Sequence, residues 1–336
     1  MGLTALVTGG GGFLGGTIVR QLVERGDTVR SLARGDYPAL RALGVETLRG
    51  DVSDATAVSK AVEGCDVVFH VAAKAGVWGK LDAYRRANVE GTRLMIEACR
   101  RSGVCRFVYT SSPSVVFDGR DMEGADESAP YPSHFEAYYP QTKAEAEQLV
   151  LSANSPSFAT VALRPHLIWG PGDNHLVPRI IARARAGRLR RIGMANKRID
   201  ATYIDNAADA HLLAADRLTP GSEVSGKVYF VAQGEPIPLW DLVDRILAAA
   251  GLPGVTRSVS RPVAEVAARI LEATYLALGL TSEPPLTRFV VRELATAHWF
   301  DLSAARRDLG YHPRVSTDEG LSRLSAWLRS GGGTVH

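Results

Sequence analysis

Short apolar runs and longer amphipathic runs alternate along the first half of the chain. The apolar runs have the length and the β-branched content of buried strands, and they lie at 4–8, 28–33, 47–50, 67–71, 106–110 and 160–164. Between some of them, apolar residues recur at helical spacing, at 13–25, 84–101 and 138–153. Strands that alternate with helices in this way predict an α/β fold, a doubly wound parallel sheet with helices on both faces.

The alternation becomes irregular after about residue 170. Helical spacing is found at 178–187, 204–218, 239–251 and 262–278, and one further apolar run of strand length lies at 227–231. We therefore expect a main domain over 1–170, whose sheet is completed by 199–232. The remainder, 171–336, is expected to form a smaller, mostly helical lobe for a substrate, interleaved with the last strands of the sheet.

One predicted helix, 262–278, carries a continuous apolar stripe. Its members are Val263, Val266, Ala267, Ile270, Leu271, Tyr275 and Leu278. The stripe fits a helix that packs on the substrate lobe. It also fits a lid, or a helix that lies on a membrane surface and admits a greasy substrate. The sequence leaves these three interpretations open.

A glycine-rich loop separates the first predicted strand from the first helix. Gly9, Gly12 and Gly15 satisfy the spacing GxxGxxG, and Gly10 gives a second match, to GxGxxG. Glycine lets the strand turn sharply, lets the backbone approach a pyrophosphate, and lets the helix pack closely on the sheet. The helix that follows points its amino-terminal dipole at the phosphates. A loop in this context predicts a Rossmann-type dinucleotide site, which comprises Gly9, Gly12, Phe13, Leu14 and Gly15.

The end of the second predicted strand bears on the choice between the two dinucleotides. Ala33 stands where an NAD-binding protein places an acid for the ribose 2′-hydroxyl, and Arg34 follows it. Arg34 can pair with a 2′-phosphate, which an acid would repel. We therefore expect NADP(H) as the preferred cofactor and 1–170 as an NADP-binding Rossmann domain. The nearby Asp36 keeps NAD(H) as the alternative, with Arg34 as an ordinary surface residue.

Asp51 and Val52 follow the end of the third predicted strand. In a doubly wound sheet, this position faces the adenine of the dinucleotide. We therefore include both residues in the cofactor site. The alternative role for Asp51 is to cap the helix that follows it.

A tyrosine and a lysine four residues apart, Tyr139 and Lys143, lie within the predicted helix 138–153. Residues at this spacing share one face of a helix, so an ammonium would lie beside a phenol. A phenol ordinarily titrates at about 10. The lysine charge and a positive nicotinamide can lower that pKa and make the phenol an acid or base. Ser111 and Ser112 end the strand 106–110, where a hydroxyl can hydrogen-bond a reacting oxygen.

Together these motifs resemble the extended short-chain dehydrogenase/reductase family over nearly the whole chain. Further matches are HVAA at 70–73, NVEGT at 88–92, RP at 164–165, YID at 203–205 and LGYHP at 309–313. The resemblance implies that Tyr139 is the catalytic acid/base and Lys143 its partner. It implies that Ser112 is the catalytic serine, with Ser111 as the competing choice, and that Asn88 orders the site. The cofactor contacts that it implies are those of Lys143, Ala72, Ala73, Pro165, His166 and Leu167.

Within that family, the chain resembles two groups. Segments similar to the 3β-hydroxysteroid and sterol-4-carboxylate dehydrogenases lie at 110–117, 164–166 and 235–240. Segments more similar to the bacterial 2-alkyl-3-oxoalkanoate reductases of olefin biosynthesis lie at 72–79 and 163–172. The missing acid at Ala33 favours the NADPH-using reductases. The resemblance implies hydride transfer from NADPH to a long-chain β-keto acid, with steroid or sterol oxidation and nucleotide-sugar epimerisation or dehydration as alternatives.

Lys74 follows the strand 67–71, close to the predicted nicotinamide. We expect its ammonium to hold a substrate carboxylate as a point charge, while Ser112 and Tyr139 contact the reacting oxygen. A solvated loop lysine is the alternative.

Composition excludes several other classes. A net charge of +3 over 336 residues is too small to indicate a nucleic-acid partner. The three cysteines lack metal-site spacing, so no metal is expected. Neither a leader pattern nor a spanning apolar run is found, which favours a cytoplasmic protein. We expect a lipid-like small-molecule substrate, and a homodimer or association with a membrane surface or multienzyme assembly stays open.

Overall fold

The computed structural model describes residues 2–193 and 195–332. Seven parallel strands form its central sheet, in the order β10-β7-β5-β4-β1-β2-β3. Their bounds are β1 Thr4–Thr8, β2 Thr28–Ala33, β3 Glu46–Arg49, β4 Val67–His70, β5 Arg106–Thr110, β7 Ala159–Pro165 and β10 Lys227–Val231. The strands that the apolar runs predict are therefore confirmed, each to within about one residue at either end.

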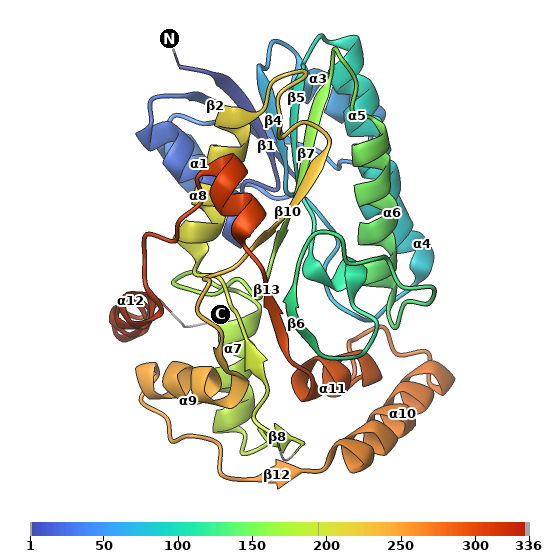
Figure 1. Cartoon of the computed structure of the whole chain (residues 1–336), viewed down its shortest axis with the longest axis vertical. Helices are drawn as coiled ribbons and strands as arrows, with labels where there is room; N and C mark the ends of the chain where they lie inside the picture. Colours follow the sequence, from blue (N-terminus) through green and yellow to red (C-terminus); the bar gives the residue numbers. More distant parts are fainter. Residues whose placement is uncertain (1, 194, 333–336) are drawn as a thin grey trace.

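Helices cover both faces of this sheet. On one face, α1 (Phe13–Glu24) packs beside α8 (Ile204–Arg217). On the other face, α3 (Ala55–Val62), α5 (Gly91–Arg101) and α6 (Tyr138–Ser152) lie side by side (Figure 1). Successive side chains of β1 enter different hydrophobic cores, because Ala5 and Val7 belong to one cluster and Leu6 to the other. The doubly wound α/β architecture is confirmed.

The helix predicted over 84–101 is interrupted. It consists of α4 (Leu81–Tyr84), a π-helical turn (Arg85–Glu90) and α5. A π turn holds one more residue than an α turn, so it rotates the side chains around it. Here it brings Asn88 inward, where the residue is 2% exposed. Apolar periodicity could not reveal this turn, because the residue that it buries is polar.

A second lobe lies below the sheet (Figure 1). It has a four-stranded sheet in the order β11-β9-β13-β6 and a two-stranded sheet of β12 and β8. Its elements are β6 Met122–Ala125, α7 Leu176–Arg185, β8 Arg191–Ile192, β9 Arg198–Ile199, β11 Ile237–Pro238, α9 Leu239–Ala249, β12 Ser258–Val259, α10 Arg261–Ala277, α11 Arg288–Ala295 and β13 His298–Phe300. The helices α7, α9 and α10 were predictable. The strands were not, because two to four residues are too few to show alternation.

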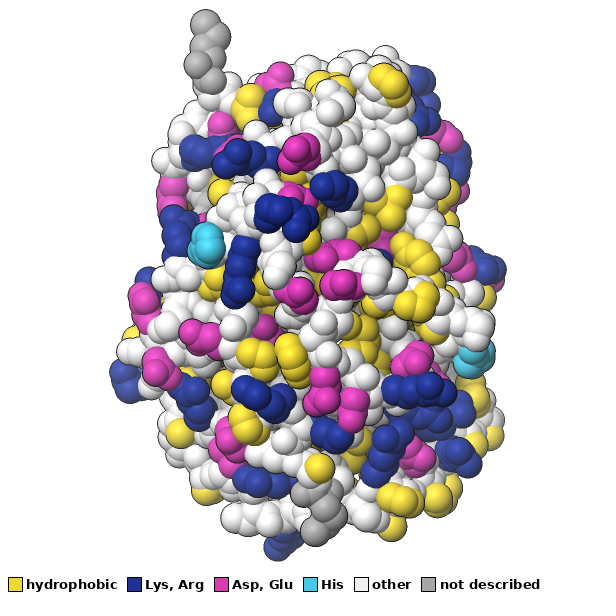
Figure 2. Space-filling view, viewed as in Figure 1, with side chains coloured by type: hydrophobic (Ala, Val, Ile, Leu, Met, Phe, Trp, Pro, Cys, Tyr) yellow, Lys and Arg dark blue, Asp and Glu magenta, His cyan; other side chains and the backbone are white. Residues whose placement is uncertain are grey.

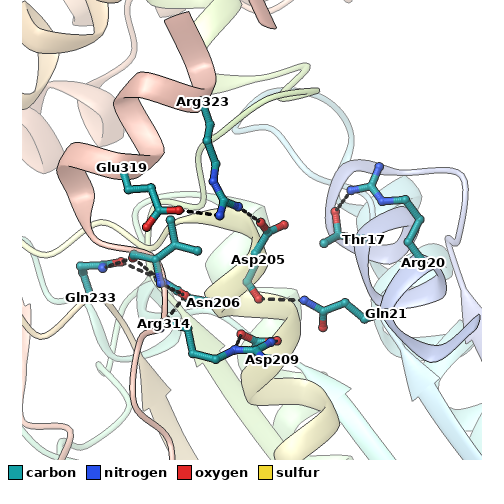
Figure 3. A network of polar contacts seen from close by, with 11 residues as sticks. Thr17, Arg20, Gln21, Asp205, Asn206, Asp209, Gln233, Arg314, Glu319 and Arg323 are labelled. Carbon is teal, nitrogen blue, oxygen red and sulfur yellow. Dashed lines mark hydrogen bonds and ion pairs between the residues drawn. The ribbon is translucent and has the colours of Figure 1, made fainter. Parts of the chain in front are cut away.

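Four short or C-terminal elements complete the chain: α2 Pro38–Ala42, a 3₁₀ turn Pro113–Val116, a π turn Ala305–Leu309 and α12 Thr317–Arg329. Polar side chains join α1, α8 and α12 (Figure 3). Gln21 on α1 donates to the Asp205 carbonyl on α8 at 3.2 Å, and Arg323 on α12 pairs with the Asp205 carboxylate at 3.0 Å. The buried Asn206 donates to the Val315 carbonyl at 2.7 Å. The YID segment therefore holds the C-terminal part against the main sheet.

Helix α10 packs against α11 and leaves much of its predicted apolar stripe exposed. Val263, Val266 and Ile270 are 58%, 55% and 61% exposed, whereas the small residues Ala264 and Ala268 are buried. The helix thus packs on the lobe, but through Ala264 and Ala268, and Val263, Val266 and Ile270 of the stripe do not form that contact. In the described part of the chain, no helix is long and apolar enough to cross a membrane.

Candidate active site

The carboxyl ends of β1, β4, β5 and β7 meet along one edge of the sheet, next to the second lobe (Figure 1). These four strands are neighbours in the sheet. The segments that follow them are the glycine loop 9–15, the loop 72–74, the serines 111–112, and 165–167 at the end of β7. The site residues predicted from separate parts of the sequence are thus brought to one place.

The glycine loop requires glycine at two positions. Gly9 has a φ of 70°, in the left-handed region, and a Cβ on it would lie 3.1 Å from the Ala72 Cα. A Cβ on Gly15 would lie 2.3 Å from the Gly9 carbonyl oxygen. Side chains would therefore fill the space beside this turn. The bare backbone fits the close approach of a pyrophosphate.

Helix α1 begins directly after Gly12, at this loop. Among the described residues, no side chain caps it, and its first turn holds no acid. Leu14 is buried in the core and Phe13 is half-buried against it. A contact of these two residues with a phosphate would come from their backbone N–H groups, and the helix dipole favours such an anion.

At the end of β2, Ala33 is half-buried and Arg34 is exposed. The Asp36 carboxylate, which kept NAD(H) as an alternative, forms an ion pair with Arg41. The hydrogen bond from Arg41 holds the pKa of Asp36 below its ordinary value. Part of the negative charge beside Arg34 is therefore already compensated.

A small hollow opens beside Ala33, and its lining includes Ser31, Tyr37, Arg41 and Arg49. The Arg49 Nε also donates to the Arg34 carbonyl at 3.2 Å. The wall also contains Asp36, the partner of Arg41, so its two cations besides the neighbouring Arg34 are Arg49 and an already paired Arg41. Sequence reasoning missed both, because no motif links them to the end of β2.

Asp51 forms a local turn with Ser53. Its carboxylate accepts from the Ser53 backbone N–H at 2.9 Å and from the Ser53 hydroxyl at 2.8 Å, and these bonds lower its pKa. The following helix α3 is capped by Asp54, which accepts from the Thr56 N–H at 2.9 Å. The capping role considered for Asp51 is therefore wrong. Val52 is buried, in close contact with the backbone at Gly91.

Tyr139 and Lys143 lie one turn apart on α6. Lys143 is 2% exposed. Its ammonium donates to the Thr110 carbonyl, at the end of β5, with an N···O distance of 2.5 Å. The same ammonium lies 4.1 Å from the centre of the Tyr109 ring. These contacts fix the lysine charge against the end of β5.

The two candidate serines differ in what they reach. The Ser112 hydroxyl hydrogen-bonds with the Ser114 hydroxyl at 2.9 Å and accepts from the Ser114 N–H at 3.2 Å. It also interacts with the Tyr139 phenol in the sense that lowers the phenol's pKa. Ser111 is buried, and its hydroxyl has no hydrogen-bond partner among the described residues. Only Ser112 of the two contacts the phenol.

Burial sets the proton affinities of this group. It raises the pKa of Tyr139 to about 12, and the Ser112 hydrogen bond opposes the rise. It lowers the pKa of Lys143 to about 7, against the opposing effect of the Glu147 carboxylate. The expected lowering of the Tyr139 pKa by Lys143 is not found in the described structure, because the ammonium is bonded to the Thr110 carbonyl. At neutral pH, Tyr139 is a protonated phenol, which is the form that donates a proton.

Asn88 joins the loop after β4 to the catalytic helix. Its side-chain oxygen accepts from the Lys74 N–H at 2.7 Å. Its side-chain amide donates to the Lys74 carbonyl at 3.2 Å and to the Thr142 hydroxyl at 3.0 Å. Since Thr142 precedes Lys143 on α6, Asn88 links both segments.

The loop 72–74 is fastened to β1 at its start. The Thr8 hydroxyl accepts from the Ala72 N–H at 3.0 Å, and Ala73 is exposed. The Lys74 side chain is half-buried, with its ammonium 4.9 Å from the centre of the Tyr84 ring. Among the described residues, Lys74 forms no ion pair. The site thus contains a cation that is available to an anionic ligand.

The end of β7 carries Pro165, His166 and Leu167. Pro165 is buried in the sheet. The His166 ring bonds through Nδ1 with the Asp200 carbonyl at 2.9 Å and packs on Phe300, so this side chain connects the two lobes. Leu167 has a φ of 39°, and it is the one non-glycine residue with positive φ in the described chain. Such backbone strain is found preferentially at functional sites.

Sequence reasoning missed a buried ion pair behind Lys143. Glu147, one turn further along α6, is buried completely. Its carboxylate accepts from Arg164 Nε at 3.0 Å and Nη2 at 2.6 Å, and from the Tyr131 hydroxyl at 2.7 Å. Arg164 was recognised only as part of the RP motif. A glutamate in an amphipathic helix is ordinarily exposed, so the pattern gave no signal for its partner.

Helix α11 of the second lobe packs over the catalytic segments. Phe289 contacts Phe117, just after the Ser112 turn, with ring centres 6.1 Å apart. Arg292 pairs with Glu136, which lies just ahead of Tyr139. These contacts place the residues of α11 against the active site.

Glu293 follows Arg292 on this helix and interacts electrostatically with Tyr139. It has neither a hydrogen bond nor an ion pair within the described structure. Burial raises the pKa of its carboxyl group to about 7. Sequence reasoning missed this residue, because only the folding of the second lobe brings α11 to α6.

Comparisons with known proteins identify the family of the chain. Residues 6–259 match the profile described as the 3-beta hydroxysteroid dehydrogenase/isomerase family. A relative from Stenotrophomonas maltophilia, named 2-alkyl-3-oxoalkanoate reductase, is 53% identical over 324 residues, which cover 96% of this chain and 98% of the relative. A relative of the same name from Shewanella oneidensis is 47% identical over 332 residues, covering 96% and 86%. The crystal structure of gox2253 matches with a TM-score of 0.80 at 28% identity, over 99% of both chains.

Proposed function

The chain belongs to the 3-beta hydroxysteroid dehydrogenase/isomerase family and is an NAD(P)-dependent oxidoreductase; from this premise we propose that it reduces a long-chain 2-alkyl-3-oxoalkanoate to the 2-alkyl-3-hydroxyalkanoate. The observation that carries the proposal is the proton-donating group at the sheet edge. There Tyr139 is a protonated phenol that interacts with Ser112, and Lys143 lies one turn away. The identity to two reductases of this name over nearly the whole chain supports the same reaction.

We propose NADPH as the cofactor. The loop 9–15 and the first-turn amides of α1 would hold its pyrophosphate, and Arg34 with Arg41 and Arg49 would attract its 2′-phosphate. The remaining contacts would be made by Asp51, Val52, Ala72, Ala73, Lys143, Pro165, His166 and Leu167. When bound, NADPH supplies the hydride for the ketone carbon. NAD(H) is the alternative, and a ratio of the two Michaelis constants decides between them.

The proton side of the reaction belongs to the protein. Tyr139 donates its phenolic proton to the ketone oxygen as negative charge develops there. The Ser112 hydroxyl hydrogen-bonds the same oxygen and stabilises that charge. Lys143, whose ammonium is held on the Thr110 carbonyl one turn from Tyr139, would contact the cofactor. Asn88 keeps the loop after β4 and helix α6 in register for these contacts.

Lys74 is proposed to bind the substrate carboxylate, because its ammonium lies at the site without a described counter-ion. Replacing Lys74 by Met should raise the Michaelis constant for keto acids much more than for neutral ketones. Lys80→Met, a change at an exposed lysine of the same loop, is the matched control. Equal effects of Lys74→Met on acids and neutral ketones would exclude this role.

A substrate panel tests the proposed function. The panel contains a long-chain 2-alkyl-3-oxo acid with NADPH or NADH, a 3β-hydroxysteroid with the oxidised nucleotides, and a UDP-sugar. We expect the keto acid to be reduced and NADPH to be preferred. Turnover of the steroid without the keto acid would replace this function by the one in the family's description. Conversion of the UDP-sugar by protein that retains its nucleotide would indicate an epimerase or dehydratase.

A further inference from the structure

The outer face of α10 is apolar and has no cover in the described structure. Eight large hydrophobic side chains of the described chain are exposed, and six of them lie between Val263 and Leu280. They are Val263, Val266, Ile270, Leu276, Leu278 and Leu280, with exposures from 42% to 71%. Scattered single exposed residues are ordinary, whereas a concentration on one helix indicates a surface that binds something.

The charges around this face are positive on balance. Both acids of α10 are already paired, Glu265 with Arg261 and Glu272 with Arg288. Arg269 lies on the exposed face between Val266 and Ile270, and no acid within the described chain pairs with it. Figure 2 shows Lys and Arg side chains gathered beside hydrophobic ones over the region where Figure 1 places α10 and α11. The surface therefore suits a partner with an apolar interior and negative groups at its boundary.

The same helix touches the substrate loop. The Trp78 indole packs edge-on against Tyr275 of α10, with ring centres 6.2 Å apart, and donates to the Leu280 carbonyl at 3.1 Å. Trp78 and Lys74 belong to one loop after β4. Through its partner helix α11, α10 is also joined to the segments of Ser112 and Tyr139. The apolar face is thus at the substrate end of the protein.

We propose that this face, Val263 to Leu280, docks on the surface of a lipid bilayer that contains anionic lipids, and brings the substrate end of the site to the membrane. This inference rests on the proposed function, because a long-chain keto acid partitions into membranes. The aliphatic side chains enter the boundary between headgroups and acyl chains. Arg269 extends its stem along them and its guanidinium to the phosphates.

The area of the face argues against a second copy of the chain as the occupant. Helix α10 has 17 residues. It is therefore about 25 Å long, and one exposed helix face about 10 Å wide covers roughly 250 Å². A stable protein interface takes roughly 800 Å² from each partner, about three times as much. The exposed large side chains are also all aliphatic, whereas interfaces concentrate binding energy in Trp, Tyr and Arg. Binding to a bilayer needs no shape complementarity, and it adds electrostatic attraction to the burial of apolar area.

Flotation of the full-length protein with vesicles tests the proposal. The vesicles are phosphatidylcholine alone, or phosphatidylcholine with phosphatidylglycerol. We expect the parent protein to float with the anionic vesicles and to bind less at high salt. The double variant Val266→Glu/Ile270→Glu should bind the anionic vesicles at least about tenfold more weakly than the parent, because it places two charges in the apolar stripe. Leu43→Glu, at an exposed leucine outside this lobe, should float like the parent.

A charge reversal tests the contribution of Arg269. Arg269→Glu should weaken binding to the anionic vesicles while affecting binding to phosphatidylcholine little. Lys60→Glu reverses an exposed charge on α3 and is its control. A parent that floats with neither vesicle, or a double variant that floats as well as the parent, overturns the proposal. A dimer in solution that the double variant converts to a monomer, without vesicle binding, would assign the face to a second copy.

Activity on a short, water-soluble 3-oxo acid separates this inference from the proposed function. None of the four variants changes a residue that we place at the active site, so each should retain the parent's rate without vesicles. If no keto acid is reduced, the function is wrong, and flotation still reports on the surface by itself. If the soluble acid is reduced and flotation fails, the docking inference alone is wrong.

Discussion

The buried ion pair behind Lys143 makes a strong prediction about stability. Glu147→Gln keeps the shape of the side chain and removes its charge. The Arg164 guanidinium would then be buried without a counter-ion, since the side chains of Arg164 and Glu147 are 3% and 0% exposed. Removing one partner of such a pair is expected to lower the free energy of unfolding by about 3–5 kcal/mol. Loss of the charged acceptor also weakens the hydrogen bond from the Tyr131 hydroxyl.

Urea unfolding followed by circular dichroism measures this change. Glu145→Gln is the matched control, because Glu145 lies on the same helix in a half-exposed pair with Arg85. That pair should contribute no more than about 1 kcal/mol. Adding Arg164→Met to Glu147→Gln removes the unpaired charge and should recover much of the loss. If Glu147→Gln lowers the free energy of unfolding no more than Glu145→Gln does, the buried pair does not stabilise the fold.

Glu147→Gln should also shift the pH at which kcat/KM for reduction declines. Lys143 has a pKa of about 7, and the Glu147 carboxylate raises it from the value that burial alone would give. The ammonium is present below that pH, so kcat/KM for reduction should fall as the pH rises through about 7. Glu147→Gln removes the raising effect, so the limb should shift to lower pH. An unchanged limb would show that another group titrates there.

Three further substitutions address separate parts of the site. Tyr139→Phe should lower kcat for NADPH oxidation by a factor of about 10²–10⁴ while nucleotide binding is retained. Tyr138→Phe, at the neighbouring exposed tyrosine, should change kcat little. Similar rates for the two variants would contradict the role of Tyr139 as proton donor. Ala33→Asp should raise the Michaelis constant for NADPH relative to that for NADH, because the carboxylate repels a 2′-phosphate. Glu293→Gln should abolish any rise in the Michaelis constant for keto acids above pH 7, where the parent carboxyl ionises and repels the substrate.

The main sheet and the place of the site could be predicted from the sequence, because both depend on local signals. Strands buried on both faces are continuous apolar runs, and they were located nearly residue by residue. Parallel strands share one carboxyl edge, so motifs such as the glycine loop and Ser112 had to meet there once the strands were known. The helix that carries Tyr139 and Lys143 needed no long-range information either.

The groups that escaped prediction come to the site through contacts that no local pattern records. Glu147 looks like an exposed helix residue until Arg164 of β7 is placed against it. Glu293 reaches Tyr139 only because α11 packs over the Ser112 turn. For α10, periodicity correctly located an apolar stripe, but it could not tell on which side of the helix the protein lies. A helical pattern defines a face, and only the tertiary structure shows what that face contacts.

The proton affinity of Tyr139 bears on the direction of the reaction. With a pKa of about 12, roughly one phenol in 10⁵ is ionised at pH 7. Oxidation of an alcohol needs the phenolate as a base, whereas reduction of a ketone needs the phenol as an acid. Burial therefore keeps Tyr139 in the phenol form, which is compatible with reduction and is also the form of an ordinary tyrosine at this pH. The missing acid at Ala33 concerns the choice of nucleotide instead, because it removes the group that would hold the 2′-hydroxyl of NAD. The assignment as a reductase therefore rests on the two relatives of that name, and a proton-donating Tyr139 is compatible with it.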